Sequence, residues 1–315
     1  MLVVVIDTEE EFDWSAPFDP ARTTVANIAE QGRAQAVFDA HGVVPTYVVD
    51  YPVATTPAAV ATLGAFQAAG RCEIGAHLHP WVTPPDDGVR PIEPWRSYPG
   101  NLPEAQEAAK LAALTEAIKN SFGISPVVYK AGRYGIGPAT LPLLAGLGYR
   151  VDVSVVPHTD FSADGGPDFR GLPAEPLMLA PGVVELPLSV HFVGLMAGFG
   201  STLQSIPARG VASRLHLAGV ASRLGLLERL RLSPEGYVLA DLERQTQAAF
   251  AAGTRVFMLT YHSSALLPGA TAYVGDTAGR DRFVATIDAY LRFFLGTLGG
   301  RTSTAAQLAA ELAAL

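Results

Sequence analysis

Apolar segments in distant parts of the sequence are followed by side chains that can bind metals or move protons. Residues 2–6 are apolar and lead into a stretch with five acids, Asp7, Glu9, Glu10, Glu11 and Asp13. Carboxylates placed this close raise one another's pKa unless a cation neutralises them. The stretch therefore indicates either a bound cation or a solvated acidic turn that caps the next helix.

Histidines follow two further apolar segments. His77 and His79 are two positions apart, so on an extended chain their side chains point to the same face. A His-x-His pair near a carboxylate suits zinc or another divalent metal held by nitrogen and oxygen ligands. His262 closes a later apolar run, residues 256–261. These residue types favour a metal site, with structural histidines as the alternative.

The elements that must position these residues alternate along the chain. Apolar, β-rich runs at 2–7, 46–50, 72–77, 127–130, 151–155, 183–190 and 256–261 predict strands, several of them buried on both faces. Helical patterns lie between them, and Ser233-Pro234-Glu235 predicts the start of another helix. Repeated β-then-α units predict an α/β fold with a parallel sheet, here a closed or nearly closed barrel of about seven strands.

In a β/α barrel the active site lies at the carboxyl ends of the strands. The predicted strands place six candidate residues at that rim: Asp7, Glu9, His77, His79, Lys130 and His262. Two segments interrupt the alternation. Residues 80–103 are rich in Pro, Gly, Asp and Trp and predict a long functional loop. Residues 191–232 predict a helical insertion, which could be a lid or a partner surface.

Composition limits the class of protein. The chain has 315 residues, 49% of them hydrophobic, and a formal charge of −8, which together favour one barrel domain spanning residues 1–315. Without a basic patch, we expect no nucleic-acid or anionic-membrane partner. The single cysteine, Cys72, excludes a disulfide framework and predicts a buried side chain. No secretory leader or membrane span is evident, so we expect a cytoplasmic protein.

Taken together and in order, five segments resemble the motifs of the polysaccharide deacetylase family of carbohydrate esterases, whose fold is a distorted β/α barrel. The segments are residues 7–9, 75–79, 129–135, 151–157 and 259–263. In the family, the second motif normally has histidines four residues apart; here Trp81 stands four residues after His77, and His79 is the second candidate ligand. Glu9 replaces the usual metal-binding aspartate, and Lys130 replaces the usual arginine.

The resemblance implies a role for each residue. Glu9, His77 and His79 would hold a divalent metal, most simply zinc. Asp7 would be the general base, held ionised by Lys130 or Arg133. His262 would be the general acid, with either Asp152 or Asp160 orienting its imidazole.

The resemblance also implies a reaction, the metal-dependent hydrolysis of acetyl or other acyl groups from an N-acylated sugar. Two alternatives remain open: an amidohydrolase acting on a small cyclic amide, as in some relatives of the family, and a carbohydrate-binding barrel without activity. Loop aromatics at the same rim could form a sugar platform or could be packing anchors; they are Trp14, Trp81, Trp95 and Tyr134.

Overall fold

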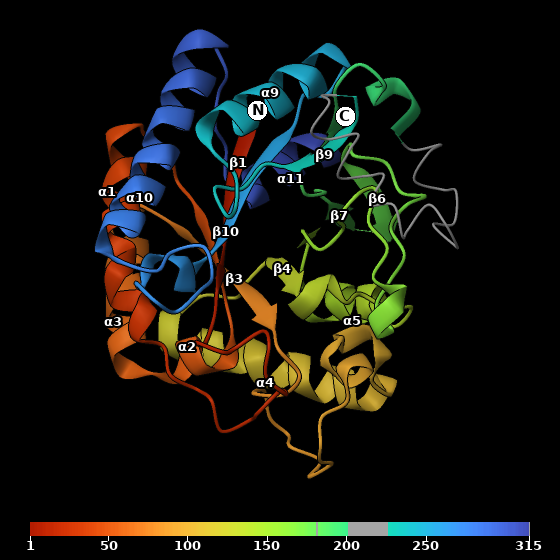
Figure 1. The fold of residues 1–315 in the computed structure, drawn as a ribbon. Helices are drawn as coiled ribbons and strands as arrows, with labels where there is room; N and C mark the ends of the chain where they lie inside the picture. The colour runs from red at the N-terminus through yellow and green to blue at the C-terminus, as the bar shows by residue number, and fades with distance from the viewer. Residues whose placement is uncertain (181, 201–225, 315) are drawn as a thin grey trace.

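The structure, a computed structural model, describes residues 1–180, 182–200 and 226–314 (Figure 1). Its main sheet has eight strands in the spatial order β10-β1-β2-β3-β4-β5-β7-β6. Seven run parallel: β1 Leu2–Thr8, β2 Thr46–Val49, β3 Glu73–Leu78, β4 Val128–Ala131, β5 Val151–Asp152, β7 Val183–Glu185 and β10 Phe257–His262. Strand β6, Leu177–Ala180, is antiparallel to β7.

A hairpin lies across the opening of this curled sheet, between strand β10 and the segment that follows β5. Strands β8 (Val190–Val193) and β9 (Glu228–Arg231) pair antiparallel. Residues flanking the hairpin bond to both sides of the opening, since Leu188 N donates to Val155 O at 2.9 Å and Thr260 N donates to Leu232 O at 3.2 Å. The result is the predicted distorted, nearly closed parallel β/α barrel.

The second half of the barrel wall differs from the sequence-based prediction. The segment 183–190 is not one strand, because the chain leaves the sheet after β7 and re-pairs as β8. Of the segment 151–155, only the first two residues form a strand. The expected helical insertion is described only at its ends, where β8 and β9 lie, and residues 201–225 are outside the described part of the chain.

Helices surround the barrel, with α1, α3 and α10 along one side in Figure 1. The α-helices are α1 Gln31–Ala40, α2 Tyr51–Thr55, α3 Pro57–Ala68, α4 Glu104–Phe122, α5 Thr140–Leu147, α9 Leu239–Ala251, α10 Thr277–Arg292 and α11 Ala305–Ala313. Short 3-10 helices are η1 Ala26–Glu30, η2 Pro94–Ser97, η3 Pro99–Asn101, η4 Gly132–Tyr134, η5 Ser162–Asp164, η6 Ala197–Phe199 and η7 Ser263–Leu266, and η8 Phe293–Thr297 is a π-helix. The predicted helix start at Ser233 is wrong, because α9 begins at Leu239 and the preceding residues form a loop. Over the described ranges, no helix has the length and apolarity that crossing a membrane requires.

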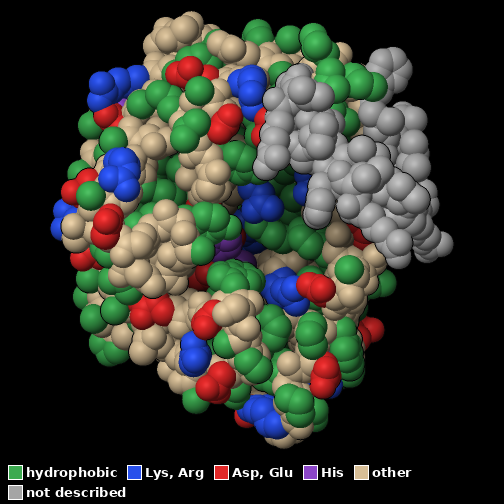
Figure 2. All heavy atoms as spheres, viewed as in Figure 1, with side chains coloured by type: hydrophobic (Ala, Val, Ile, Leu, Met, Phe, Trp, Pro, Cys, Tyr) green, Lys and Arg blue, Asp and Glu red, His purple; other side chains and the backbone are tan. Residues whose placement is uncertain are grey.

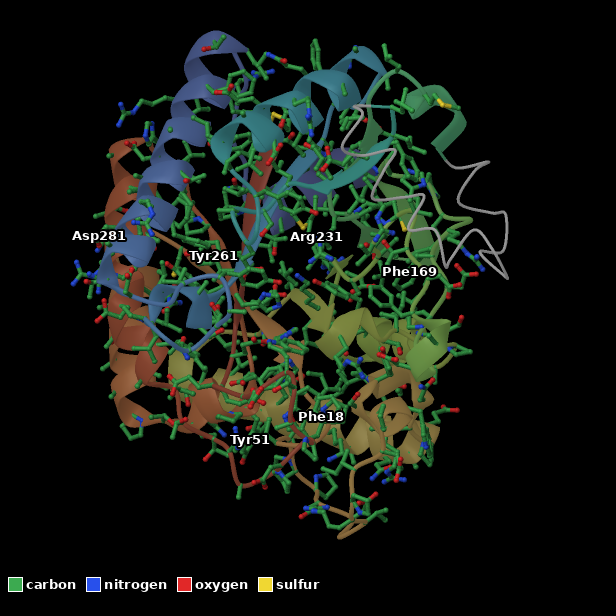
Figure 3. The ribbon with its side chains drawn as sticks, viewed as in Figure 1. Phe18, Tyr51, Phe169, Arg231, Tyr261 and Asp281 are labelled. Atoms are coloured by element: carbon green, nitrogen blue, oxygen red, sulfur yellow. The ribbon has the colours of Figure 1, made fainter. Side chains whose placement is uncertain are left out.

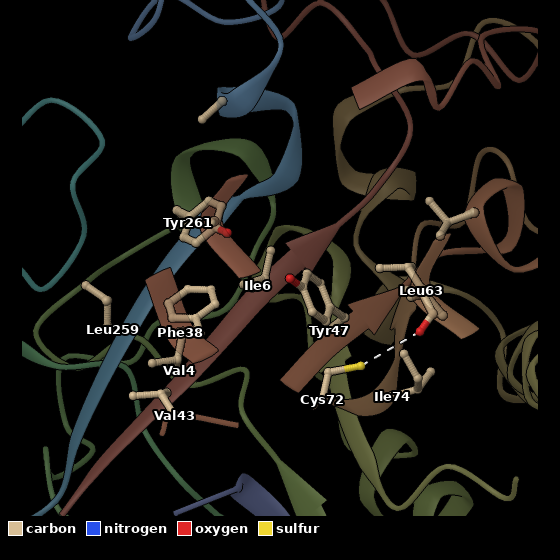
Figure 4. Close-up of a cluster of buried hydrophobic side chains, with 14 of the residues drawn as sticks. Val4, Ile6, Phe38, Val43, Tyr47, Leu63, Cys72, Ile74, Leu259 and Tyr261 are labelled. Carbon is tan, nitrogen blue, oxygen red and sulfur yellow. Dashed lines mark hydrogen bonds between the residues drawn. The ribbon is translucent and has the colours of Figure 1, made fainter. Parts of the chain in front are cut away.

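Buried apolar side chains form two clusters, one inside the barrel and one between the strands and the helices. Figure 4 shows part of the outer cluster, in which Cys72 is buried and its Sγ lies 3.9 Å from the carbonyl oxygen of Leu63. Burial raises the pKa of the Cys72 thiol to about 12, so it is an inert core residue as predicted. In the inner cluster, Leu308 of α11 packs near the amino ends of the strands, where Leu2 bridges Thr302.

The alternation of side chains along β1 determines which residues face the barrel interior. Val3 and Val5 belong to the inner cluster, while Val4 and Ile6 belong to the outer one. Since successive strand side chains point to opposite faces, Asp7 continues the inward series. On β3, β4 and β10 the outward residues include Ala76, Tyr129 and Tyr261, and the inward residues that follow them are His77, Lys130 and His262.

Candidate active site

Glu9, His77 and His79 converge at the carboxyl ends of β1 and β3. Oε2 of Glu9 lies 3.5 Å from Nε2 of His77 and 3.4 Å from Nε2 of His79, and all three side chains are buried. Within the described chain, the Glu9 carboxylate oxygens and Nε2 of His79 have no hydrogen-bond partner. Buried polar atoms are rarely left unpaired, and one carboxylate with two imidazoles is a known zinc ligand set. These residues therefore fit a divalent metal.

The protonation states of the three side chains agree with this fit. Burial lowers the pKa of His77 and lowers that of His79 to about 4, so both imidazoles are neutral, as metal binding requires. Burial raises the pKa of Glu9 to about 7, and a bound cation would favour its ionised form. The His77 Nδ1–H donates to the Lys130 carbonyl at 3.1 Å, which leaves Nε2 facing Glu9.

Glu10 holds the His79 ring so that its Nε2 points towards Glu9. His79 can therefore serve as a candidate ligand in place of the histidine that the family motif has four residues after the first. Oε2 of Glu10 lies 2.8 Å from Nδ1 of His79, and Oε1 accepts from the Trp81 indole N–H at 2.7 Å. The Trp81 ring also stacks on His79, with centroids 4.2 Å apart. Trp81 thus supports the candidate ligand His79 from the position four residues after His77. Gly132 permits this packing, because a Cβ there would lie 2.6 Å from Cδ2 of His79.

A second buried carboxyl group lies behind Glu10. Asp50 accepts from the backbone N–H of Glu10 at 2.6 Å and from Val53 N at 2.8 Å, where it caps α2. Burial raises the pKa of Glu10, and burial together with Glu10 raises the pKa of Asp50 well above its ordinary value. Glu10, Asp50 and His79 also lie close enough to form a second possible metal group. Because Nδ1 of His79 bonds to Glu10, we infer that Glu10 and Asp50 orient the candidate ligand His79 and do not hold a second metal ion.

Asp7 and Lys130 form a buried ion pair inside the barrel. The Lys130 ammonium lies 2.6 and 2.8 Å from the two Asp7 oxygens and 3.4 Å from Oγ1 of Thr260. Burial alone would raise the pKa of Asp7, but Lys130, followed by His262 and His77, outweighs it and lowers the pKa below the ordinary value. Asp7 is therefore an ionised carboxylate although it is buried.

His262 lies beside Asp7, with Nε2 3.6 Å from Oδ2 of the carboxylate. Glu235 accepts from Nδ1 of His262 at 2.9 Å and from its backbone N–H at 2.8 Å. Burial disfavours the imidazolium, but the carboxylates of Glu235, Glu9 and Asp7 outweigh it and raise the pKa of His262 well above its ordinary value. His262 is thus a protonated imidazole held in one orientation.

The other predicted residues lie apart from this centre. Asp152 sits between the inward residues Val151 and Val153, so its side chain points away from the interior and contacts Ser154 and Glu185. Burial raises the pKa of Asp152 to about 6.

Asp160 has other partners than His262: it accepts from Ser162 N at 2.9 Å and pairs with Arg170 at 3.1 Å. Glu235 occupies the place predicted for these aspartates. In the sequence, Glu235 stands in a predicted helix start, and nothing in that pattern points to His262.

Of the two cations expected beside Asp7, only Lys130 contacts it. Arg133 donates to Ser97 Oγ at 2.7 Å and pairs with Asp164 at 2.8 Å, and its guanidinium lies 4.2 Å from the ring centre of Tyr98. Arg133 therefore belongs to the wall of the site.

A cavity of about 340 Å³ opens over the reacting groups. Its floor includes Asp7, Glu9, His77, His79 and His262, and its aromatic walls are Trp14, Tyr98, Tyr134, Phe161 and Tyr273. Figure 2 shows a hollow in this face with histidine and Lys or Arg side chains inside it. Of the loop aromatics considered as a sugar platform, Trp14 and Tyr134 line the cavity, while Trp81 is buried against His79.

Comparisons with known proteins support the fold. No protein-family model matches the sequence, and a comparison with curated proteins finds no match. A solved structure of a candidate polysaccharide deacetylase from Mycobacterium smegmatis is 18% identical with a TM-score of 0.57, over 99% of this chain and 90% of that one. A candidate glycoside hydrolase/deacetylase from Parabacteroides distasonis is 12% identical with a TM-score of 0.63, over 98% and 70%. The allantoinase Puue is 14% identical with a TM-score of 0.54, over 99% and 90%. The chain has the fold of polysaccharide deacetylases, and at these identities the likeness establishes the fold alone.

Proposed function

We propose that the protein is a metal-dependent hydrolase that removes acetyl or other acyl groups from the nitrogen of an N-acylated sugar. One observation carries the proposal: the Glu9–His77–His79 cluster, in which the Glu9 oxygens and His79 Nε2 lack hydrogen-bond partners within the described chain, shares a cavity with an ionised carboxylate and a protonated imidazole. A sugar-binding module without activity needs neither a base nor an acid at that place.

Glu9, His77 and His79 would hold the metal, and their mixed oxygen and nitrogen set suits zinc. When bound, a divalent metal supplies Lewis acidity to a water molecule and to an acyl oxygen. Glu10 keeps Nε2 of His79 directed into the cluster, because it engages Nδ1 of the same ring.

Asp7 is the base in this scheme. Lys130 holds its carboxylate ionised and fixes both oxygens, so that Asp7 can accept a proton from the water that attacks the acyl carbon. His262 is the acid, and Glu235 keeps it protonated and oriented. The carbon–oxygen bond forms, the carbon–nitrogen bond breaks, and the proton of His262 passes to the departing nitrogen. The products are a carboxylic acid and a free amine.

The size of the cavity also fits a second substrate class, the small cyclic amides. A volume of about 340 Å³ is at the small end of ligand pockets, which suits a small cyclic amide as well as one sugar unit of a polymer. In the same chemistry, opening a cyclic amide would leave acid and amine on one product molecule.

The experiment is an assay of the zinc-loaded chain on N-acetylated oligosaccharides and on small cyclic amides, with acetate and new amines as readouts. We expect acetate from the oligosaccharides and its loss in His262→Ala, which should still bind zinc. His41→Gln is the matched control, because His41 pairs with Asp288 elsewhere in the fold. Amine from the cyclic amides alone would favour the second class. Turnover of neither, with zinc bound, would overturn the proposed hydrolysis and favour a binding protein.

A further inference from the structure

Two arginines on β9 face the same side of the hairpin, towards the open end of the barrel. Arg229 and Arg231 are two residues apart, and Leu230 between them is buried. The Arg229 guanidinium donates to Oγ1 of Thr159 at 3.2 Å. Arg231 is partly buried, and Figure 3 labels it near the centre of the barrel.

Arg231 contacts a residue of the cavity wall. Its Nη1 donates to the hydroxyl of Tyr134 at 3.0 Å, and its Cζ lies 5.6 Å from the centre of that ring. The ammonium of Lys130, which binds Asp7, lies 5.3 Å from the centre of the same ring. Tyr134 therefore separates the reacting carboxylate from Arg231, and a substrate that extends across this ring reaches both.

The guanidinium of Arg231 has donors to spare. A guanidinium carries five N–H donors, and in the described part of the chain the Tyr134 hydroxyl is the acceptor that Arg231 engages. No carboxylate of residues 1–180, 182–200 or 226–314 forms an ion pair with Arg229 or Arg231. Glu235, on the loop that follows β9, is engaged by His262.

Arg133, which lines the cavity, provides the contrast to Arg231. Its donors go to Pro94 O at 3.3 Å, to Ser97 Oγ and to Asp164, so it is already satisfied by the protein. Burial, and next the guanidinium of Arg231, lower the pKa of Arg229, whereas neighbouring groups, Tyr134 first, raise the pKa of Arg231. Arg231 is therefore a cation, and a partly buried guanidinium with unused donors favours an anionic partner.

We propose that Arg231, assisted by Arg229, binds a carboxylate of the substrate, so that the protein acts on an acidic N-acylated sugar. This inference rests on the proposed function and narrows its substrate class. The planar guanidinium fork suits a carboxylate through two parallel hydrogen bonds. The carboxylate can belong to the sugar ring, as in a uronic acid, or to the acyl group, as in an N-succinyl sugar.

The test compares three methyl glycosides: N-acetylglucosamine, its C6 carboxylic acid, and N-succinylglucosamine. The kcat/KM of the zinc-loaded chain is measured by amine formation, and Kd is measured by calorimetry on His262→Ala, in which hydrolysis is blocked. We expect one of the two acids to be preferred over the neutral sugar by at least about 10-fold in both quantities. Which acid is preferred identifies the source of the carboxylate.

Variants assign this preference to the guanidinium. Arg231→Gln should reduce the ratio between the preferred acid and the neutral sugar to about one, and Arg231→Lys should leave an intermediate ratio because it keeps charge but loses the fork. Arg282→Gln is the control, since Arg282 is exposed on α10. Circular dichroism checks that each variant folds. The preference for an acid is measured on the unaltered chain, so that part of the test does not depend on whether a variant folds.

The two proposals fail separately. Preferential binding of an acid without hydrolysis of any glycoside would contradict the proposed reaction and leave the carboxylate site standing. Hydrolysis without preference for either acid, equal binding of all three, or binding of none would overturn the carboxylate site. An acid preference that persists in Arg231→Gln would overturn the assignment to Arg231.

Discussion

Strands β1, β3 and β10 differ from β5, β7 and the β8–β9 hairpin in how they carry polar residues. The first group is long and continuously paired, and each strand presents a candidate site residue inward at its carboxyl end, as with Asp7, His77 and His262. The second group is short and interrupted. Its polar residues come from β9 and the loop after it, where Arg231 contacts Tyr134 and Glu235 contacts His262. We call β1, β3 and β10 the regular wall, and β5, β7, β8, β9 and the loop after β9 the irregular wall. In the proposed function, the regular wall holds the reacting groups and the irregular wall orients them.

The largest effect should come from Glu9, the candidate metal ligand that follows β1. Glu9→Ala removes the one carboxylate of the cluster, and we expect hydrolysis to fall by at least about 1,000-fold because metal assistance contributes several kcal/mol. Glu116→Ala, an exposed change on α4, is the control. The assay is acetate release at saturating zinc. Near-normal activity in Glu9→Ala would show that the proposed metal site does not take part in hydrolysis.

Lys130→Met should have the second-largest effect, because it leaves the Asp7 carboxylate buried without its cation. We expect activity at pH 7 to fall by about 100-fold or more as Asp7 becomes protonated, and stability to fall by about 3 kcal/mol. In the unaltered chain the lowered pKa of Asp7 stabilises the fold at neutral pH, and this contribution is lost as pH falls through that pKa. In the variant the pKa is raised, so lowering the pH towards it should stabilise the fold. Urea unfolding at several pH values, with Lys119→Met as control, tests the sign.

The third prediction compares two carboxylates of the irregular wall. The reaction needs protonated His262, so its rate should fall as pH rises through the raised pKa of that imidazole. Glu235→Gln should move this limb to lower pH by about one unit, which is about 10-fold in rate above the limb. Asp152→Asn should leave the limb in place, since Asp152 contacts Ser154 and Glu185. The reverse pattern would restore Asp152 as the partner of His262.

The smallest effect should come from the aromatic rim. Trp14 is 53% exposed and Tyr273 is 56% exposed, and both line the cavity. Replacing either by alanine should raise KM by about 2- to 10-fold with kcat nearly unchanged, the usual scale of one aromatic contact. A large loss of kcat instead would show that the rim takes part in the chemistry.

The same contrast explains what the sequence could predict. An apolar run that ends in a charged residue or a histidine indicates a strand and its carboxyl end. This pattern predicts that Asp7, His77, Lys130 and His262 lie together, and the structure brings them together. The partner of His262 was missed, because it comes from a loop whose approach depends on how β9 pairs.

The supports of His79 were missed for a similar reason. Asp50 and Trp81 both bond to Glu10, which orients His79, and Trp81 also stacks on the His79 ring. No local sequence pattern indicates these contacts. The break between β7 and β8 was also missed, because an apolar run shows burial without showing which partner strand it pairs with.

The central claim is that Glu9, His77 and His79 bind a single metal ion, and calorimetric titration of the metal-free chain with zinc tests it most directly. We predict a single site per chain, weakened by at least about 100-fold in Glu9→Gln and in His79→Ala, and by about 10- to 100-fold in Glu10→Gln. Glu235→Gln should bind zinc like the unaltered chain. Unchanged zinc affinity in Glu9→Gln and His79→Ala, or no zinc binding by the unaltered chain, would contradict the claim.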